Sequence, residues 1–150
     1  MKIPFYNFAA GADARRFTFI SEGPRPIEKV VLYSESDLPD YYILSLADLE
    51  PDGELNYFSA RNNGDLERIM ATVAQTLLAF FAYYPTARVA FAGSTPSRTR
   101  LYQIVLTREL QAASEKFVIS GLRNTAIEPF APNQTYDGFV VWLSSSTLAP

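Results

Sequence analysis

Apolar and polar residues alternate along the first part of the chain, with the period of two that is typical of half-buried β-strands. The alternation is clearest where Phe17, Phe19 and Ser21 fall on one face. Turn-forming Gly, Pro, Asp and Asn residues divide this part into four predicted strands, at residues 15–23, 27–34, 41–48 and 54–59. Short turns between successive strands predict an antiparallel meander.

The period then becomes that of an amphipathic helix, which we predict from Asp65 as the N-cap to Tyr84, just before Pro85. Its apolar stripe consists of Leu66, Ile69, Met70, Val73, Leu77, Phe80, Phe81 and Tyr84. The opposite face carries no charge beyond the first turn, and it consists of Ala71, Thr72, Gln75, Ala79 and Ala82. Such a face is either covered by another element of the chain or used to contact a second copy or a protein partner. Both alternatives stay open.

A second helix lies between predicted strands in the remaining part of the chain. We expect this helix over residues 96–114, with Thr95 as a hydroxyl cap and Pro96 in the first helical position. The strands are predicted at residues 88–92, 116–122 and 138–143, and a loop is predicted at 124–133. The first of these strands is short and apolar, which is typical of a buried parallel strand.

These elements predict the fold class. It is α+β, with an antiparallel meander followed by helix, strand, helix and strand, in one mixed sheet and a single domain over residues 1–150. The order of elements resembles the ribonuclease H-like topology. Composition agrees with one globular domain, because 48% of the 150 residues are hydrophobic and 19% are charged.

The chain contains no cysteine and no histidine, which excludes several kinds of catalytic site. Thiol nucleophiles, Cys/His zinc sites, imidazole bases and the Ser-His-Asp triad are all ruled out. A ribonuclease H-like nuclease would instead need several acids around two metal ions. Glu22, Asp65 and Glu67 are near the required positions, but Gly93 to Thr95 stand where a third acid is needed. We therefore assign no catalytic residue, no metal site and no cofactor.

Charge and hydropathy also limit the location and the partners. The formal net charge of −3 argues against broad electrostatic binding to nucleic acid, although a local basic patch stays open. The apolar run after Lys2 is broken by Pro4 and Asn7, so we expect no signal peptide. The longest uncharged run is residues 69–87, and its part up to Pro85, residues 69–85, is too short for a comfortable membrane span. We expect a cytoplasmic protein with no membrane partner.

The richest functional signal is the segment 91–102, with the sequence FAGSTPSRTRLY. It predicts the end of a buried strand, a glycine turn and a helix start that carries several hydroxyls and two arginines. A helix N-terminus favours anions, and arginines in the first turn are disfavoured by the helix dipole unless something negative is near. The residues of this candidate anion site are Ser94, Thr95, Ser97, Arg98, Thr99 and Arg100.

Two interpretations of this segment stay open. In the first, the helix start binds an anionic group, such as a phosphate. In the second, a hydroxyl cap and internal ion pairs to Asp48, Glu50, Asp65 or another acid satisfy the same groups. Because Arg98 and Arg100 lie about 200° apart on a helix, both cannot easily hold one small ligand. The segment also lacks the glycine and lysine pattern of a P-loop.

At residues 93–102 the chain resembles a family of small bacterial proteins catalogued as a domain of unknown function. Further strings of the chain are similar to that family, at residues 5–8, 17–23, 62–65 and 71–73, so the likeness extends over most of the chain. The resemblance implies no activity. It implies that the chain is a complete small protein rather than a fragment.

The sequence therefore suggests two functions of different classes. The first is a non-enzymatic binding or interaction module that recognises an anionic group on a nucleotide, a nucleic acid or a partner. The alternative is a toxin-like effector of a bacterial conflict system that acts on nucleic acid. A structural homodimer formed through the uncharged helix face is a third hypothesis.

Overall fold

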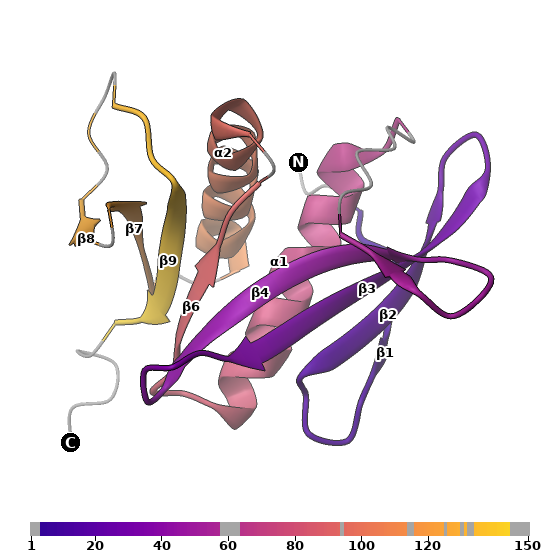
Figure 1. Ribbon diagram of the computed structural model, residues 1–150, viewed down its shortest axis with the longest axis horizontal. Coiled ribbons are helices and arrows are strands. Elements are labelled where there is room, and N and C mark those ends of the chain that lie inside the picture. The colour runs from indigo at the N-terminus through magenta and orange to yellow at the C-terminus, as the bar shows by residue number, and fades with distance from the viewer. Residues whose placement is uncertain are drawn as a thin grey trace.

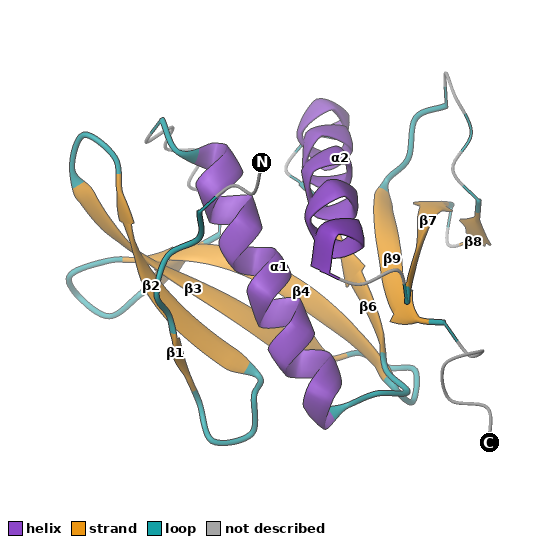
Figure 2. Ribbon diagram, turned by 180° about the vertical axis from the view of Figure 1, so that it is seen from behind, coloured by secondary structure: helices purple, strands orange, loops and turns teal. Residues whose placement is uncertain are grey.

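The computed structural model describes residues 4–57, 64–93, 95–113, 116–124, 126–129, 131 and 134–144. Within these residues a mixed sheet carries two helices against one of its faces (Figures 1 and 2). The strands are ordered β1-β2-β3-β4-β6-β9-β7-β8, and β5 pairs with the end of β4. The α+β class and the mixed sheet are confirmed.

The predicted meander forms the first half of the sheet. Its predicted strands are β2 (Arg16–Glu22), β3 (Pro26–Glu35) and β4 (Tyr41–Leu49). The short strand β1 (Ala9–Ala10), which was not predicted, precedes them, and each strand is antiparallel to the next. The short β5 (Leu55–Asn56) lies within the predicted fourth strand, whose last two residues are outside the described residues. The alternation sends Phe17 and Phe19 towards the helices, and both are buried.

The helix α1 (Leu66–Tyr83) connects β4 to β6 (Arg88–Phe91), which is the parallel neighbour of β4. Antiparallel strands can be joined by a tight turn, but a parallel pair needs a crossover of this kind. The parallel pairing is short, because residues 41–43 of β4 match residues 88–90 of β6 and the two strands then separate.

The second half of the sheet contains α2 (Pro96–Ala113), β7 (Phe117–Arg123), β8 (Ala126–Glu128) and β9 (Gly138–Leu143). The last strand lies between β6 and β7 and is antiparallel to both. Among the described strands, β4 and β6 are the one parallel pair, so the ribonuclease H-like order is not confirmed. The loop predicted at residues 124–133 is corrected in one respect, since it includes the short strand β8.

The core lies between the helices and the sheet and is rich in aromatic rings. Tyr33 of β3 stacks on Phe80 of α1, with their ring centroids 4.3 Å apart and an interplanar angle of 11°. Tyr42 and Tyr84 also contact Phe80. These contacts hold α1 across β3 and β4, and they explain the periodic aromatic positions of the helix. In the described part of the chain, neither helix is long and apolar enough to cross a membrane.

The uncharged face of α1 is covered in part by the chain itself. Ala71 and Thr72 are buried, and the backbone N–H of Tyr6 donates to Thr72 Oγ1 at 2.9 Å. Ala82 is exposed, whereas Gln75 and Ala79 are half-buried. Intramolecular cover therefore accounts for the N-terminal half of this face. Contact of the other half with a second copy or a partner stays a prediction.

Candidate functional site

A cavity of about 250 Å³ lies where β4 and β6 diverge. Past their three parallel residue pairs, β6 ends at Phe91, and β4 continues to its pairing with β5 at Asp48 and Leu49. The lining residues come from β3, β4, β6, the turn after β6 and the first turns of α2, together with Tyr57 just after β5. In open α/β sheets, ligands bind beyond the carboxyl ends of the strands, and this cavity is at the carboxyl end of the parallel pair.

The turn that follows β6 requires a glycine. A Cβ atom on Gly93 would lie 2.8 Å from the Cβ of Arg98 and 2.8 Å from the backbone nitrogen of Thr99. The Gly93 N–H donates to Thr99 Oγ1 at 2.9 Å, and Thr99 is 3% exposed. The glycine thus lets the first turn of α2 pack directly on the strand end, which fixes the position of Arg98 at the cavity.

The predicted hydroxyl cap is confirmed at Thr95. Its Oγ1 accepts the N–H of Arg98 at 3.1 Å, and its carbonyl accepts the hydroxyl of Thr99 at 3.0 Å. The same carbonyl accepts the N–H of Thr99 at 2.9 Å. The backbone donors of Arg98 and Thr99 are therefore used inside the helix start. Thr99 serves this packing and not an exposed hydroxyl site.

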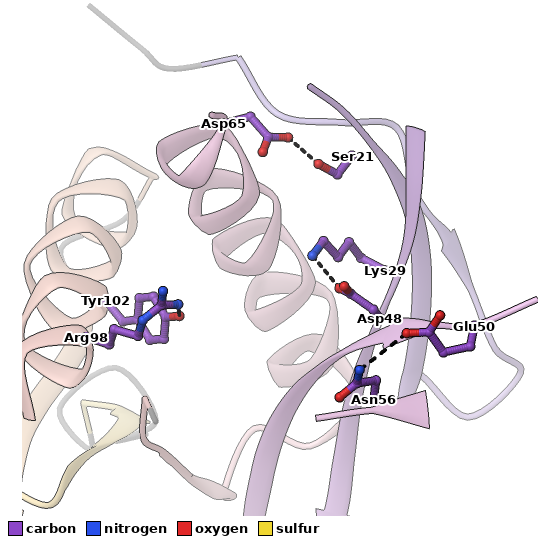
Figure 3. Close-up of polar contacts among 8 residues, drawn as sticks. All are labelled: Ser21, Lys29, Asp48, Glu50, Asn56, Asp65, Arg98 and Tyr102. Carbon is purple, nitrogen blue, oxygen red and sulfur yellow. Dashed lines mark hydrogen bonds and ion pairs between the residues drawn. The ribbon is translucent and has the colours of Figure 1, made fainter. Parts of the chain in front are cut away.

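The side chain of Arg98 lines the cavity together with Tyr102 (Figure 3). Its Nη1 lies 3.5 Å from the Tyr102 hydroxyl, which is the outer limit of a hydrogen bond, and the Tyr102 ring stacks on Phe91. Within the described ranges, neither Arg98 nor Arg100 forms an ion pair with a carboxylate.

The acids considered as internal partners contact other residues. Asp48 pairs with Lys29, and Glu50 accepts the amide of Asn56 at 3.3 Å. Asp65 accepts the hydroxyl of Ser21 (Figure 3) and also the hydroxyl of Tyr6. None of these three carboxylates forms an ion pair with Arg98 or Arg100 among the described residues.

The two arginines point to different places, as their helical spacing predicts. Arg100 is exposed and lines a separate cavity of about 150 Å³ with Ser97, Gln103 and Tyr136. Arg98 lines the larger cavity between the strands. Ser94, the remaining residue of the predicted site, lies outside the described residues.

A buried ion pair forms part of the larger cavity's wall. Lys29 of β3 and Asp48 of β4 are directly opposite in the antiparallel register, and their side chains are 5% and 2% exposed. Lys29 was not predicted from the sequence as part of a site. The signal was present, because Lys29 lies between Ile27 and Val31 at an inward position of the alternating pattern.

A second polar cluster surrounds the start of α1. Asp65 is at the predicted N-cap position, but its carboxylate makes no side-chain cap hydrogen bond and instead binds Tyr6 and Ser21. The guanidinium of Arg68 lies 3.9 Å from the Tyr6 ring centroid. Burial raises the pKa of Tyr6, and its hydrogen bond to Asp65 adds to this increase. The cluster fastens the N-terminal segment to α1 and β2.

No group of three or more acidic, cysteine or histidine side chains that could hold a metal ion occurs in the part of the chain that the structure describes. The fold and the cavity define a small α+β protein with a candidate ligand site between two strands and a helix. Residues 2–144 match the model of the Family of unknown function (DUF6934), and the chain belongs to this family. No curated protein and no solved structure matches the chain.

Proposed function

We propose that this chain is a non-enzymatic binding protein that holds an anionic, phosphate-type group at Arg98 in the cavity between β4 and β6. The observation that carries the proposal is the position of Arg98. It lines a cavity of about 250 Å³, and its guanidinium has no carboxylate partner among the described residues.

The charges around the cavity support this assignment. Lys29 and Asp48 pair with each other in its wall, whereas Arg98 has no ion-pair partner among the residues that the structure describes. A guanidinium presents several N–H donors in a planar fork that suits phosphate and carboxylate groups. Because Thr95 already accepts the N–H groups of Arg98 and Thr99, we place the anion at the side chain and not at the backbone amides.

Isothermal titration with inorganic phosphate and ribose 5-phosphate tests the proposal. The wild-type chain should bind at least one of them, and Arg98→Ala should weaken binding about ten-fold or more, as expected for a lost charge-assisted contact. Arg100→Ala is the matched control, because it removes the same charge from the same helix but from the other cavity. The proposal is wrong if no anion binds the wild type, or if both variants lose affinity equally.

The toxin-like effector remains the alternative, and no contact among the described residues favours it. Expression in a bacterial host separates the two functions. Growth arrest that Arg98→Ala or Asp65→Ala relieves would support the effector, and normal growth at high expression would count against it.

A further inference from the structure

We propose that the open edge of β2 binds an extended polypeptide segment of alternating basic and apolar residues, which adds to the sheet beside Ile20. This site is separate from the cavity at Arg98 and goes beyond the proposed function. It lies in a groove of about 640 Å³, which is lined by residues 5–9, by four residues of β2 and by Glu28 and Arg68.

The main chain of β2 faces its two neighbours alternately. The carbonyl of Arg15, just before β2, accepts the N–H of Tyr33 in β3, and the carbonyl of Arg16 accepts the N–H of Gly11 on the other side. In an antiparallel ladder the N–H and C=O groups of one residue point to the same side, and successive residues point to opposite sides. The even-numbered residues of β2 therefore direct their backbone groups towards β1.

The edge of β2 is open beyond the end of β1. This short strand lies at the end of the sheet (Figure 2) and pairs with only Phe17 and Thr18. Further along, the N–H of Glu22 donates to the hydroxyl of Tyr6 at 3.0 Å. Between them, the N–H and C=O groups of Ile20 face the same side and have no hydrogen-bond partner among the described residues. An unpaired edge of this kind is a template for another strand.

The side chains beside this open position select the chemistry of the added segment. Ile20 is 52% exposed, and Glu28 of β3 is directly opposite it in the antiparallel register. Glu22 lies on the same face of β2 as Ile20, and both glutamates are exposed. A β-branched residue opposite Ile20 would cover its side chain, and a lysine or arginine opposite Glu22 would pair with a carboxylate.

The balance of charge in the groove also favours a basic segment. Neither Glu22 nor Glu28 forms an ion pair within the described ranges. Arg68 is the cation among the described lining residues, but it is half-buried, and its guanidinium lies 3.9 Å from the ring centroid of Tyr6. The exposed charge at this edge is therefore that of the two carboxylates.

A second copy of β2 does not suit this edge. In a symmetric antiparallel pair centred on Ile20, Glu22 of one copy would lie opposite Thr18 of the other, and Thr18 is already paired with β1. A pair centred on Ser21 would need the N–H of Glu22, which donates to Tyr6. We therefore place a separate, short segment beside Ile20.

Amide hydrogen exchange measured by NMR tests the open edge directly. In the free chain the Ile20 amide should exchange at least about ten-fold faster than that of Ser21, which faces β3. The peptide KVKVK, acetylated and amidated at its ends, should slow exchange at Ile20 and leave Ser21 unchanged. Equal protection of both amides in the free chain, or no change at Ile20 on addition of the peptide, overturns the proposal.

Fluorescence anisotropy with labelled KVKVK tests the chemistry of the segment. The peptide EVEVE should bind at least about five-fold more weakly, and Glu22→Gln/Glu28→Gln should remove that preference. Glu54→Gln is the matched control, since Glu54 is an exposed acid that does not line the groove. Spermidine carries positive charge without a peptide backbone, so displacement of KVKVK by an equal concentration of spermidine would overturn strand addition.

Arg98→Ala distinguishes this site from the proposed anion site. The variant should bind KVKVK as the wild type does, because Arg98 does not line this groove. Phosphate binding without peptide binding would overturn the edge site alone, and peptide binding without phosphate binding would overturn the anion site alone. Loss of peptide binding in Arg98→Ala, with an unchanged thermal unfolding curve, would contradict a separate site.

Discussion

Lys29 and Asp48 form a buried ion pair across β3 and β4, directly in the wall of the cavity that Arg98 lines. Two charges removed from water cost several kcal/mol each, and their mutual attraction offsets this cost only while both are present. The pair is therefore tolerated in the core only while both charges are present. Either charge alone would be destabilising at this position.

This relationship predicts an asymmetric effect of substitution. Asp48→Ala leaves the Lys29 ammonium buried without its partner, so we expect the free energy of unfolding to fall by about 3–5 kcal/mol. The double variant Lys29→Met/Asp48→Leu removes both charges and should recover most of that loss. Urea unfolding measures both variants. A double variant as unstable as Asp48→Ala would show that the charges themselves do not control stability here.

Gly93→Ala should be destabilising because its new Cβ would collide with the first turn of α2, with contacts at 2.8 Å. Overpacking of this kind costs about 1–3 kcal/mol, and it should move Arg98 away from the cavity. Gly11→Ala is the matched control, since the nearest atom to its Cβ is 3.4 Å away. Chemical denaturation should rank Gly93→Ala well below the control, and equal stabilities would contradict the packing described.

Thr95→Ala should cost about 1 kcal/mol, because the Arg98 N–H loses the hydroxyl that caps the helix. Thr95→Ser keeps the hydroxyl and should remain close to the wild type. Urea unfolding and amide hydrogen exchange at Arg98 are the two measurements. Faster exchange in the alanine variant alone supports the cap, whereas the same exchange rate in both variants argues against it.

Because Tyr33 is buried, we expect the protein to lose stability at alkaline pH. Burial raises its pKa well above the usual value of 10, and the hydrogen bond with Thr76 only partly opposes this increase. Above about pH 10 the unfolded chain therefore releases a proton that the folded chain retains. The resulting contribution to stability is complete below pH 10 and declines as the pH rises, by about 1.4 kcal/mol per pH unit.

Urea unfolding between about pH 8 and pH 11 tests this linkage. Tyr33→Phe should show a shallower decline, because the titrating group is gone. The decline should not vanish, since burial also raises the pKa values of Tyr6 and Tyr42. Identical slopes for the variant and the wild type would be inconsistent with a proton held at Tyr33.

The meander and the two helices could be predicted because each follows a strong local period. The strands β1 and β8 could not, since two or three residues are too few to show an alternation. The position of β9 between β6 and β7 could not be predicted from the sequence either. It depends on which strand edges remain open after the helices pack, and not on any local pattern.

The candidate site was predictable to a similar degree. The helical spacing correctly predicted that Arg98 and Arg100 lie at different places, since they line different cavities. The cap at Thr95 was predicted from its position before Pro96. The opposite wall of the cavity was not foreseen. Lys29 and Asp48 meet through the register of β3 and β4, and that register is known only when the turn between the strands is known.

The short parallel junction between β4 and β6 is where the two parts of the sheet meet. In the described residues, the junction consists of three residue pairs, with the meander on one side and β6, β9 and β7 on the other. The cavity lies at its open end, and its lining comes from both sides. A molecule bound in the cavity would therefore contact both parts of the sheet across this junction. Its presence would be reported by slower amide exchange in Leu44, Leu46 and Phe91, even if the overall shape did not change.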